Sequence, residues 1–147
     1  MQSDETFRQA PAPFADPTGE DGMATGGTAP PLRVLIVEDD PFIAIDLEDT
    51  FTEAGFEVLG PYAHAKAAVE ACRECVPDVA TLDYRVSDGT SRPVAELLDR
   101  HDVPLVMVTG SREEMERRRL FREREVFGKP CDMDRLVDRA RELATAG

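Results

Sequence analysis

Short apolar runs alternate with longer amphipathic stretches from Leu32 to the end of the chain. Runs rich in valine, isoleucine and leucine, which we predict to be strands, cover residues 33–37, 56–59, 79–82, 105–108 and 125–128. Stretches with helical periodicity cover residues 40–54, 64–75, 91–101, 112–121 and 132–144. This alternation indicates βαβ units. We therefore predict an α/β fold with a doubly wound, five-stranded parallel sheet of order 2-1-3-4-5 and helices on both faces.

Local signals refine several of these elements. Asp40 is a suitable N-cap, Pro41 suits the first turn, and Gly55 ends the first helix. The apolar face of that helix is predicted to contain Phe42, Ile45, Leu47 and Phe51. The second strand should end before Gly60-Pro61, and residues 87–89 should form a turn.

Residues 1–31 differ in composition from the rest of the chain. They contain five prolines, four glycines and five acidic residues against one arginine, and they show no helix or strand periodicity. Such a segment cannot bury enough apolar surface to offset the entropy of ordering. We predict a disordered tail over residues 1–31 and one domain over residues 32–147.

Charge and composition exclude some classes of protein. A net charge of −13 argues against general binding to nucleic-acid phosphates, so no nucleic-acid partner is expected. No apolar stretch is long enough to span a bilayer, so no membrane association is expected. The three cysteines form an odd, sparse set that suits a reducing compartment. We expect a cytoplasmic protein.

Reactive side chains follow four of the predicted strands. Glu38-Asp39 ends the first strand, Asp83 the third, Thr109 the fourth and Lys129 the fifth. Ligands of doubly wound folds bind at the carboxyl ends of the strands, near the switch in strand order. The three carboxylates would repel one another there, and a hard divalent cation such as Mg²⁺ removes that conflict.

The residue types fit phosphoryl chemistry. A carboxylate can attack phosphorus and form an aspartyl phosphate. Such transfer depends chiefly on positioning and on neutralising charge. Mg²⁺ and Lys129 can neutralise phosphoryl oxygens, and the hydroxyl of Thr109 can donate a hydrogen bond to one of them. We therefore interpret Asp83, Thr109 and Lys129 as a phosphoryl site.

These motifs give the chain a family resemblance. Residues 32–144 resemble the receiver domain of two-component response regulators, which has a flavodoxin-like fold, and the matching motifs are Val34–Pro41, Leu82-Asp83 with Asp88-Gly89, Val108–Gly110 and Lys129-Pro130. The resemblance implies that a sensor histidine kinase, or a phosphotransfer protein, phosphorylates Asp83. It implies Mg²⁺ held by Glu38, Asp39, Asp83 and the backbone carbonyl of Arg85. It also implies phosphate sensing by Thr109 and Lys129, and a cis Lys129-Pro130 bond.

The chain also departs from the family pattern. Many receivers place a switching aromatic three residues before the lysine, where this chain has Val126, and Phe127 should point to the other face of the strand. The motifs Asp83-Tyr84-Arg85 and Thr109-Gly110 resemble those of an alphaproteobacterial group of stand-alone receivers. That group carries a Phe-Ala-Thr-Gly-type motif, of which this chain has only the Thr-Gly part. Arg85 and Ser111 lie two residues beyond Asp83 and Thr109, where side chains can tune phosphate lifetime.

The predicted output is a protein contact or a phosphate sink. The charged helix at 112–121 contains Arg117, Arg118 and Arg119, and receivers commonly use the face formed by this helix, the fifth strand and the last helix for output. We predict a single-domain signalling protein, not an enzyme, that promotes only its own phosphorylation and dephosphorylation.

Two other functions remain open. One is a pseudo-receiver that binds partners without phosphate. The other is a Mg²⁺-dependent phosphatase with an aspartyl nucleophile. Such enzymes usually carry a second aspartate two residues on, where this chain has Arg85.

Overall fold

A parallel sheet forms the centre of the fold. In the computed structural model, which describes residues 30–110, 112–116 and 124–146, the five parallel strands are ordered β2-β1-β3-β6-β7. Their bounds are β1 Arg33–Val37, β2 Glu57–Tyr62, β3 Val79–Leu82, β6 Leu105–Thr109 and β7 Glu125–Gly128. Counted along the sequence, these five strands have the predicted order 2-1-3-4-5. The flavodoxin-like α/β architecture is confirmed.

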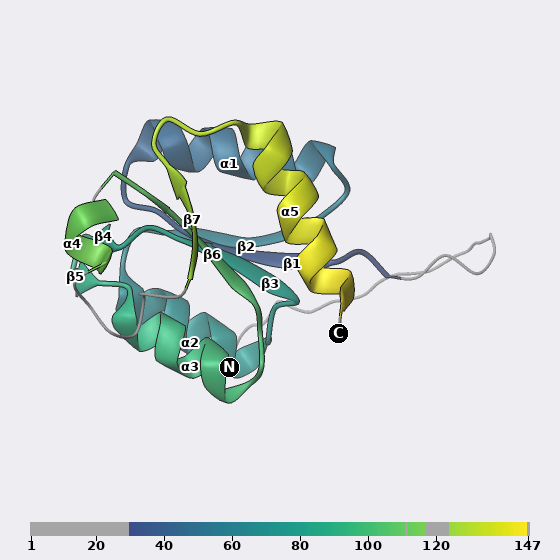
Figure 1. The fold of residues 1–147 in the computed structure, drawn as a ribbon. Coiled ribbons are helices and arrows are strands. Elements are labelled where there is room, and N and C mark those ends of the chain that lie inside the picture. The colour runs from purple at the N-terminus through teal and green to yellow at the C-terminus, as the bar shows by residue number, and fades with distance from the viewer. Residues whose placement is uncertain (1–29, 111, 117–123, 147) are drawn as a thin grey trace. The chain divides into compact units, whose positions relative to one another are not determined.

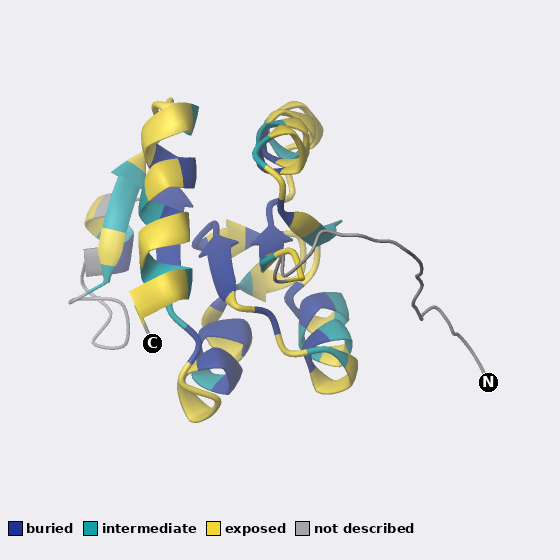
Figure 2. Cartoon of the chain, turned by 90° about the vertical axis from the view of Figure 1, so that its right-hand side faces the viewer, coloured by how far each residue is buried: buried dark blue, intermediate teal, exposed yellow. Residues whose placement is uncertain are grey.

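Helices cover both faces of the sheet (Figure 1). Helices α1 (Pro41–Glu53) and α5 (Met133–Ala146) pack on one face, and α2 (Ala65–Glu74) and α3 (Arg92–Arg100) pack on the other. Figure 2 shows the inner surfaces of the helices buried and their outer surfaces exposed. Because both sheet faces are covered, β1, β3 and β6 consist almost entirely of buried residues, as their continuous apolar runs indicate.

Helix α1 begins as predicted, but its apolar face differs from the prediction. The side chain of Asp40 accepts hydrogen bonds from the backbone N–H of Phe42 and Ile43, at 2.9 and 3.3 Å. Leu47 and Phe51 are buried, whereas Phe42 is 79% exposed and Ile45 is 55% exposed. The prediction for Phe42 and Ile45 was therefore wrong. Ile43 packs on the sheet instead, because Ile43, Leu47 and Phe51 repeat at spacings of four residues.

Strand β2 continues through the Gly60-Pro61 pair that was predicted to end it. Its register against β1 shifts between the pairs Leu35–Leu59 and Val37–Tyr62, which marks a bulge. Gly60 has a φ of +101°, and a Cβ there would lie 2.8 Å from the carbonyl oxygen of Ile36. Only glycine fits this close approach, so the bulge requires it. A Gly-Pro pair usually ends a strand, but in β2 the Gly60-Pro61 pair bends the strand and the strand continues.

The turn predicted at residues 87–89 is part of a small hairpin. Strands β4 (Arg85–Val86) and β5 (Gly89–Thr90) pair antiparallel beside the main sheet. Asp88 in this turn accepts hydrogen bonds from the N–H groups of Ala65 and Lys66, at 2.7 and 3.1 Å. The hairpin therefore caps the N-terminus of α2, which has no side-chain cap from its own N-cap residue, His64.

Helix α4 is described over Arg112–Glu116, so the predicted helical residues 117–121 lie outside the described residues. The proposed tail at residues 1–31 lies almost wholly outside them as well, and the tail and domain boundary stay predictions. Within the ranges that the structure describes, no helix has the length and apolarity needed to cross a membrane.

Candidate phosphoryl and metal site

Glu38 and Asp39 follow β1 directly, and the bulge in β2 helps to hold them. The N–H of Glu38 donates to the carbonyl oxygen of Tyr62, the residue just past the bulge, at 2.9 Å. Glu38 is 2% exposed, and its Oε2 accepts a hydrogen bond from the N–H of Asp40 at 3.0 Å. Asp39 is exposed. One acid therefore lies buried under the site while its neighbour faces solvent.

Asp83 follows β3, the neighbour of β1, and closes the acidic cluster. Its N–H donates to the carbonyl oxygen of Val37 at 2.9 Å, which fixes the two strand ends side by side. Glu38, Asp39 and Asp83 each offer a carboxylate oxygen within 4.8 Å of the others. The sequence-based expectation that these three acids meet at one edge of the sheet agrees with this geometry.

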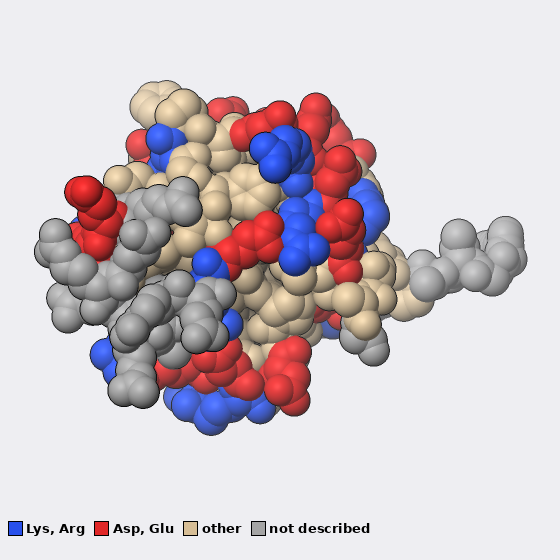
Figure 3. All heavy atoms as spheres, in the orientation of Figure 1, with Lys and Arg blue, Asp and Glu red and all other residues tan. Residues whose placement is uncertain are grey.

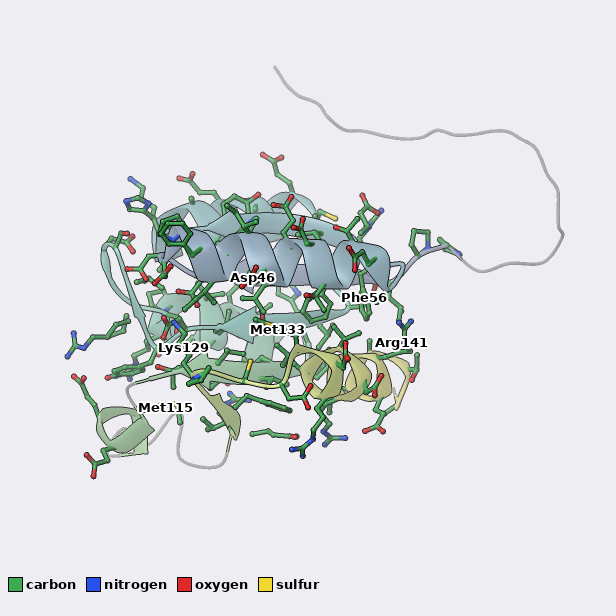
Figure 4. All side chains as sticks on the ribbon, turned by 90° about the horizontal axis from the view of Figure 1, so that it is seen from above. Asp46, Phe56, Met115, Lys129, Met133 and Arg141 are labelled. Carbon is green, nitrogen blue, oxygen red and sulfur yellow. The ribbon has the colours of Figure 1, made fainter. Side chains whose placement is uncertain are left out.

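Lys129 follows β7, the outermost strand beyond β6, and its side chain reaches the cluster. Its N–H donates to the carbonyl oxygen of Thr109 at 3.2 Å, and the Lys129-Pro130 bond is cis. Its Nζ lies 2.6 Å from Oδ2 of Asp83 and 2.9 Å from Oε1 of Glu38. Figure 4 shows Lys129 at this edge of the molecule. The ammonium group therefore bridges two carboxylates that come from different strands.

Burial and charge act against each other in this cluster. Burial raises the pKa of Glu38, and the nearby Asp83 adds to that effect, while hydrogen bonds from Lys129 and from the backbone of Asp40 oppose it. Burial alone would lower the pKa of Lys129, but its hydrogen bonds to Asp83 and Glu38 prevail and raise it. The lysine therefore stays charged.

The three acids offer a set of hard oxygen ligands. The buried Oε1 of Glu38 has the ammonium of Lys129 as its charge partner, 2.9 Å away. Two buried acids and one exposed acid, each with a carboxylate oxygen within 4.8 Å of the others, form a donor set that suits Mg²⁺.

Thr109 lies at the end of β6, opposite Gly128 of β7, and is fully buried. The strand order thus places the hydroxyl-bearing residue between the acid of β3 and the lysine that follows β7. Because each of these residues follows its strand, they all lie at the same edge of the sheet. The role of Thr109 in sensing phosphate stays a prediction.

The position predicted to act as a switch carries a small side chain, Val126. Val126 packs with the core on the α2 and α3 side of the sheet, and Phe127 packs with the core on the α1 and α5 side. The prediction that Phe127 faces away from Val126 is therefore confirmed. Val126 offers no ring that could turn toward Thr109.

Arg85 makes a contact that sequence reasoning missed. It is exposed, and its guanidinium pairs with the carboxylate of Glu114 in α4, with Nε 2.8 Å from Oε1 and Nη2 against Oε2. The two residues lie 29 positions apart. A local sequence motif does not link residues so far apart. The predicted metal contact of the Arg85 carbonyl, and the effect of Arg85 on phosphate lifetime, stay predictions.

Other predicted functional residues lie outside the described residues. These are Ser111 and the proposed output arginines Arg117, Arg118 and Arg119. Among the described residues, Arg139 of α5 bridges Glu125 and Glu142. Figure 3 shows acidic and basic side chains interleaved on the face that carries α5. Interleaved charges of this kind suit a solvated surface.

Comparisons with known proteins agree with this geometry. A family model described as the response regulator receiver domain matches residues 34–141. The transcriptional regulatory protein PdtaR of Mycobacterium tuberculosis is 31% identical over 122 residues, which cover 80% of this chain and 58% of the relative. The chemotaxis protein CheY of Thermotoga maritima is 45% identical over 56 residues, which cover 38% of this chain and 47% of the relative. The chain thus spans about half the length of these curated relatives.

A solved structure gives a more complete match. The solution structure of SdrG from Sphingomonas melonis Fr1 has a TM-score of 0.67 and 32% identity, and the match covers 80% of this chain and 98% of that one. The family model covers the acidic cluster, Lys129 and, apart from Arg33, all residues of the five parallel strands. The chain belongs to the family of response regulator receiver domains.

Proposed function

We propose that this chain is a response regulator that accepts a phosphoryl group on Asp83 from a histidine kinase or a phosphotransfer protein. The observation that carries the proposal is the position of Lys129 Nζ, 2.6 Å from Oδ2 of Asp83, inside a cluster of three acids. In the transfer, a carboxylate oxygen of Asp83 attacks phosphorus, and the bond from phosphorus to the donor histidine nitrogen breaks. Hydrolysis of the acyl phosphate by water then releases inorganic phosphate and restores the carboxylate.

Mg²⁺ is the proposed cofactor. Glu38, Asp39 and Asp83 would hold it, with the backbone carbonyl of Arg85 as a further ligand. When bound, the ion neutralises charge on the phosphoryl oxygens. The three carboxylate oxygens that lie within 4.8 Å of one another support a divalent cation at this place. Lys129 would pair with the phosphoryl group, and Thr109 would donate a hydrogen bond to it.

The phosphorylated chain would act through contact with a partner protein or as a sink that drains a kinase. The proposal includes membership of the stand-alone group of receivers, which the motifs Asp83-Tyr84-Arg85 and Thr109-Gly110 resemble. We propose that the phosphoryl transfer takes place in the cytoplasm, because an odd, sparse set of three cysteines suits a reducing compartment.

The test is transfer from an autophosphorylated histidine kinase carrying labelled phosphate. We expect label to move to the wild-type chain in the presence of Mg²⁺ and to be released by hydroxylamine, which attacks acyl phosphates. The Asp83→Asn variant should take up no label. A panel of kinases that all fail to transfer label to the wild-type chain would contradict the proposal.

A pseudo-receiver is the second candidate, because Val126 offers no aromatic ring at the switch position. Such a module would bind its partner equally well as the wild type and as Asp83→Asn. A phosphatase is the third candidate, and sustained hydrolysis of a generic phosphomonoester would support it. The exposed Arg85, at the place where such enzymes usually carry a second aspartate, argues against this third reading.

A further inference from the structure

Arg85 and Glu114 connect two elements at the mouth of the site. Arg85 opens β4, two residues after the phosphoacceptor, and Glu114 lies in α4. Their contact is a two-point pair between a planar guanidinium and a carboxylate, with Nε 2.8 Å from Oε1. Figure 1 shows α4 beside β4 and β5. The pair therefore ties α4 to the hairpin that follows Asp83.

Hydrogen bonds hold this hairpin closed at its base and against residues 63–66. The N–H of Ser87 donates to Ala63 and the N–H of Ser91 donates to Tyr84, each at 2.9 Å. Asp88 caps α2 through two hydrogen bonds. The side chain of Arg85, by contrast, is 58% exposed. A change of charge at Asp83 would therefore move the Arg85 side chain more readily than the backbone that carries it.

A phosphoryl group on Asp83 would compete with Glu114 for this guanidinium. Two residues of chain span at most about 7 Å, so a long arginine side chain can reach a group attached to Asp83. A phosphoryl group carries more negative charge than a carboxylate, and its three oxygens suit the two-point geometry of arginine. The guanidinium would then turn from the helix toward the phosphoryl group.

Met115 and Glu114 are two of the described residues through which helix α4 contacts the domain. Met115 is fully buried in the core on the α2 and α3 side, and Glu114 makes the pair with Arg85. Figure 4 shows Met115 on this short helix at the edge of the molecule. Loss of the Arg85 contact would loosen α4 while Met115 keeps it attached.

We propose that the Arg85–Glu114 ion pair couples phosphorylation of Asp83 to helix α4, because the phosphoryl group draws Arg85 away from Glu114. This inference rests on the proposed function. The ion pair would let a change of charge at Asp83 affect α4 by electrostatics. This would not require an aromatic ring at position 126, where the chain has valine.

Amide hydrogen exchange of the α4 residues tests the inference. The full chain is kept with Mg²⁺ and an excess of a small acyl-phosphate donor, or with Mg²⁺ alone, and intact mass measures phosphorylation in the same samples. In the wild type we expect phosphorylation to speed α4 exchange by about fivefold, the upper end for an exposed ion pair. In Glu114→Gln, exchange should be fast already, and phosphorylation should change it less than about twofold.

Glu96→Gln is the matched control, because Glu96 pairs with Arg92 on the exposed surface of α3 at 3.1 Å. It should respond as the wild type does. The inference fails if the wild type gains phosphate without a change in α4 exchange, or if Glu114→Gln keeps the full response. If the wild type gains no phosphate, the proposed function fails, and the inference fails with it.

Discussion

At the scale of residues, Lys129 resolves a conflict between buried acids. Its ammonium lies within 3 Å of both Asp83 and Glu38, and the Glu38 side chain is fully buried. Burial raises the pKa of Glu38, which means that its ionised form needs a nearby cation. Lys129 supplies that cation without metal. A divalent ion bound to the same carboxylates would take over part of this role.

This balance predicts how Lys129→Ala behaves. Without Mg²⁺ the free energy of unfolding should fall by about 2 kcal/mol, less than for a fully buried pair because Glu38 can take up a proton. With saturating Mg²⁺ the loss should shrink to less than half, because the ion replaces the missing charge. Urea unfolding with Mg²⁺ or with a chelator measures both values.

The other lysine provides the control for this variant. Lys66 is exposed, so Lys66→Ala should change the free energy of unfolding by no more than about 0.5 kcal/mol in either condition. If Lys129→Ala loses the same free energy of unfolding with and without Mg²⁺, the ion does not replace the charge of the lysine at these acids, and the account is contradicted.

At the scale of elements, α1 shows where a hydrophobic pattern misleads. Phe42 and Ile45 are three residues apart and looked like part of the buried face, yet both lie on the exposed side. The true face runs through Ile43, Leu47 and Phe51, where the Phe51 ring meets Phe56 edge-on, with centroids 5.0 Å apart. When a helix has apolar residues on two sides, its sequence does not reveal which side packs against the sheet.

The two phenylalanines of α1 should therefore respond very differently to substitution. Phe51→Ala should lower the free energy of unfolding by about 3–5 kcal/mol, because it opens a cavity in the core. Phe42→Ala should change it by less than about 0.5 kcal/mol, because that ring is exposed. Urea unfolding of both variants decides this, and equal losses would show that the face of α1 is assigned incorrectly.

Asp88 should make the stability of α2 depend on pH. Hydrogen bonds from the N–H groups of Ala65 and Lys66 lower the pKa of Asp88. Its contribution is therefore complete above the ordinary aspartate pKa of about 3.9 and is lost as the pH falls through the lowered value. Because Asp88 is exposed, the contribution should stay below about 1 kcal/mol.

Asp88→Asn tests that contribution, since the amide keeps an acceptor but loses the charge. The variant should be slightly less stable than the wild type at neutral pH, and the two should converge in acid. A difference that stays constant from pH 7 down to pH 3 would show that the charge of Asp88 contributes nothing.

At the scale of the whole molecule, the sheet order and the acidic cluster could be predicted because strands and helices alternate regularly. Parallel strands bring their carboxyl ends together, so Glu38, Asp39 and Asp83 meet although 44 positions separate the last two. The bulge at Gly60 could not be predicted, because it depends on the approach of the Ile36 carbonyl from another strand. The Arg85–Glu114 pair depends likewise on how α4 packs.

The central claim is that Asp83 is the phosphoacceptor of a Mg²⁺-dependent site, and intact mass tests it most directly. Wild type and Asp83→Asn are incubated with excess small acyl-phosphate donor, with Mg²⁺ or with a chelator. We predict that the wild type with Mg²⁺ gains the mass of one phosphoryl group, and that neither the chelated wild type nor the variant does. A gain that persists in Asp83→Asn, or no gain by the wild type under donor excess with Mg²⁺, would contradict the claim.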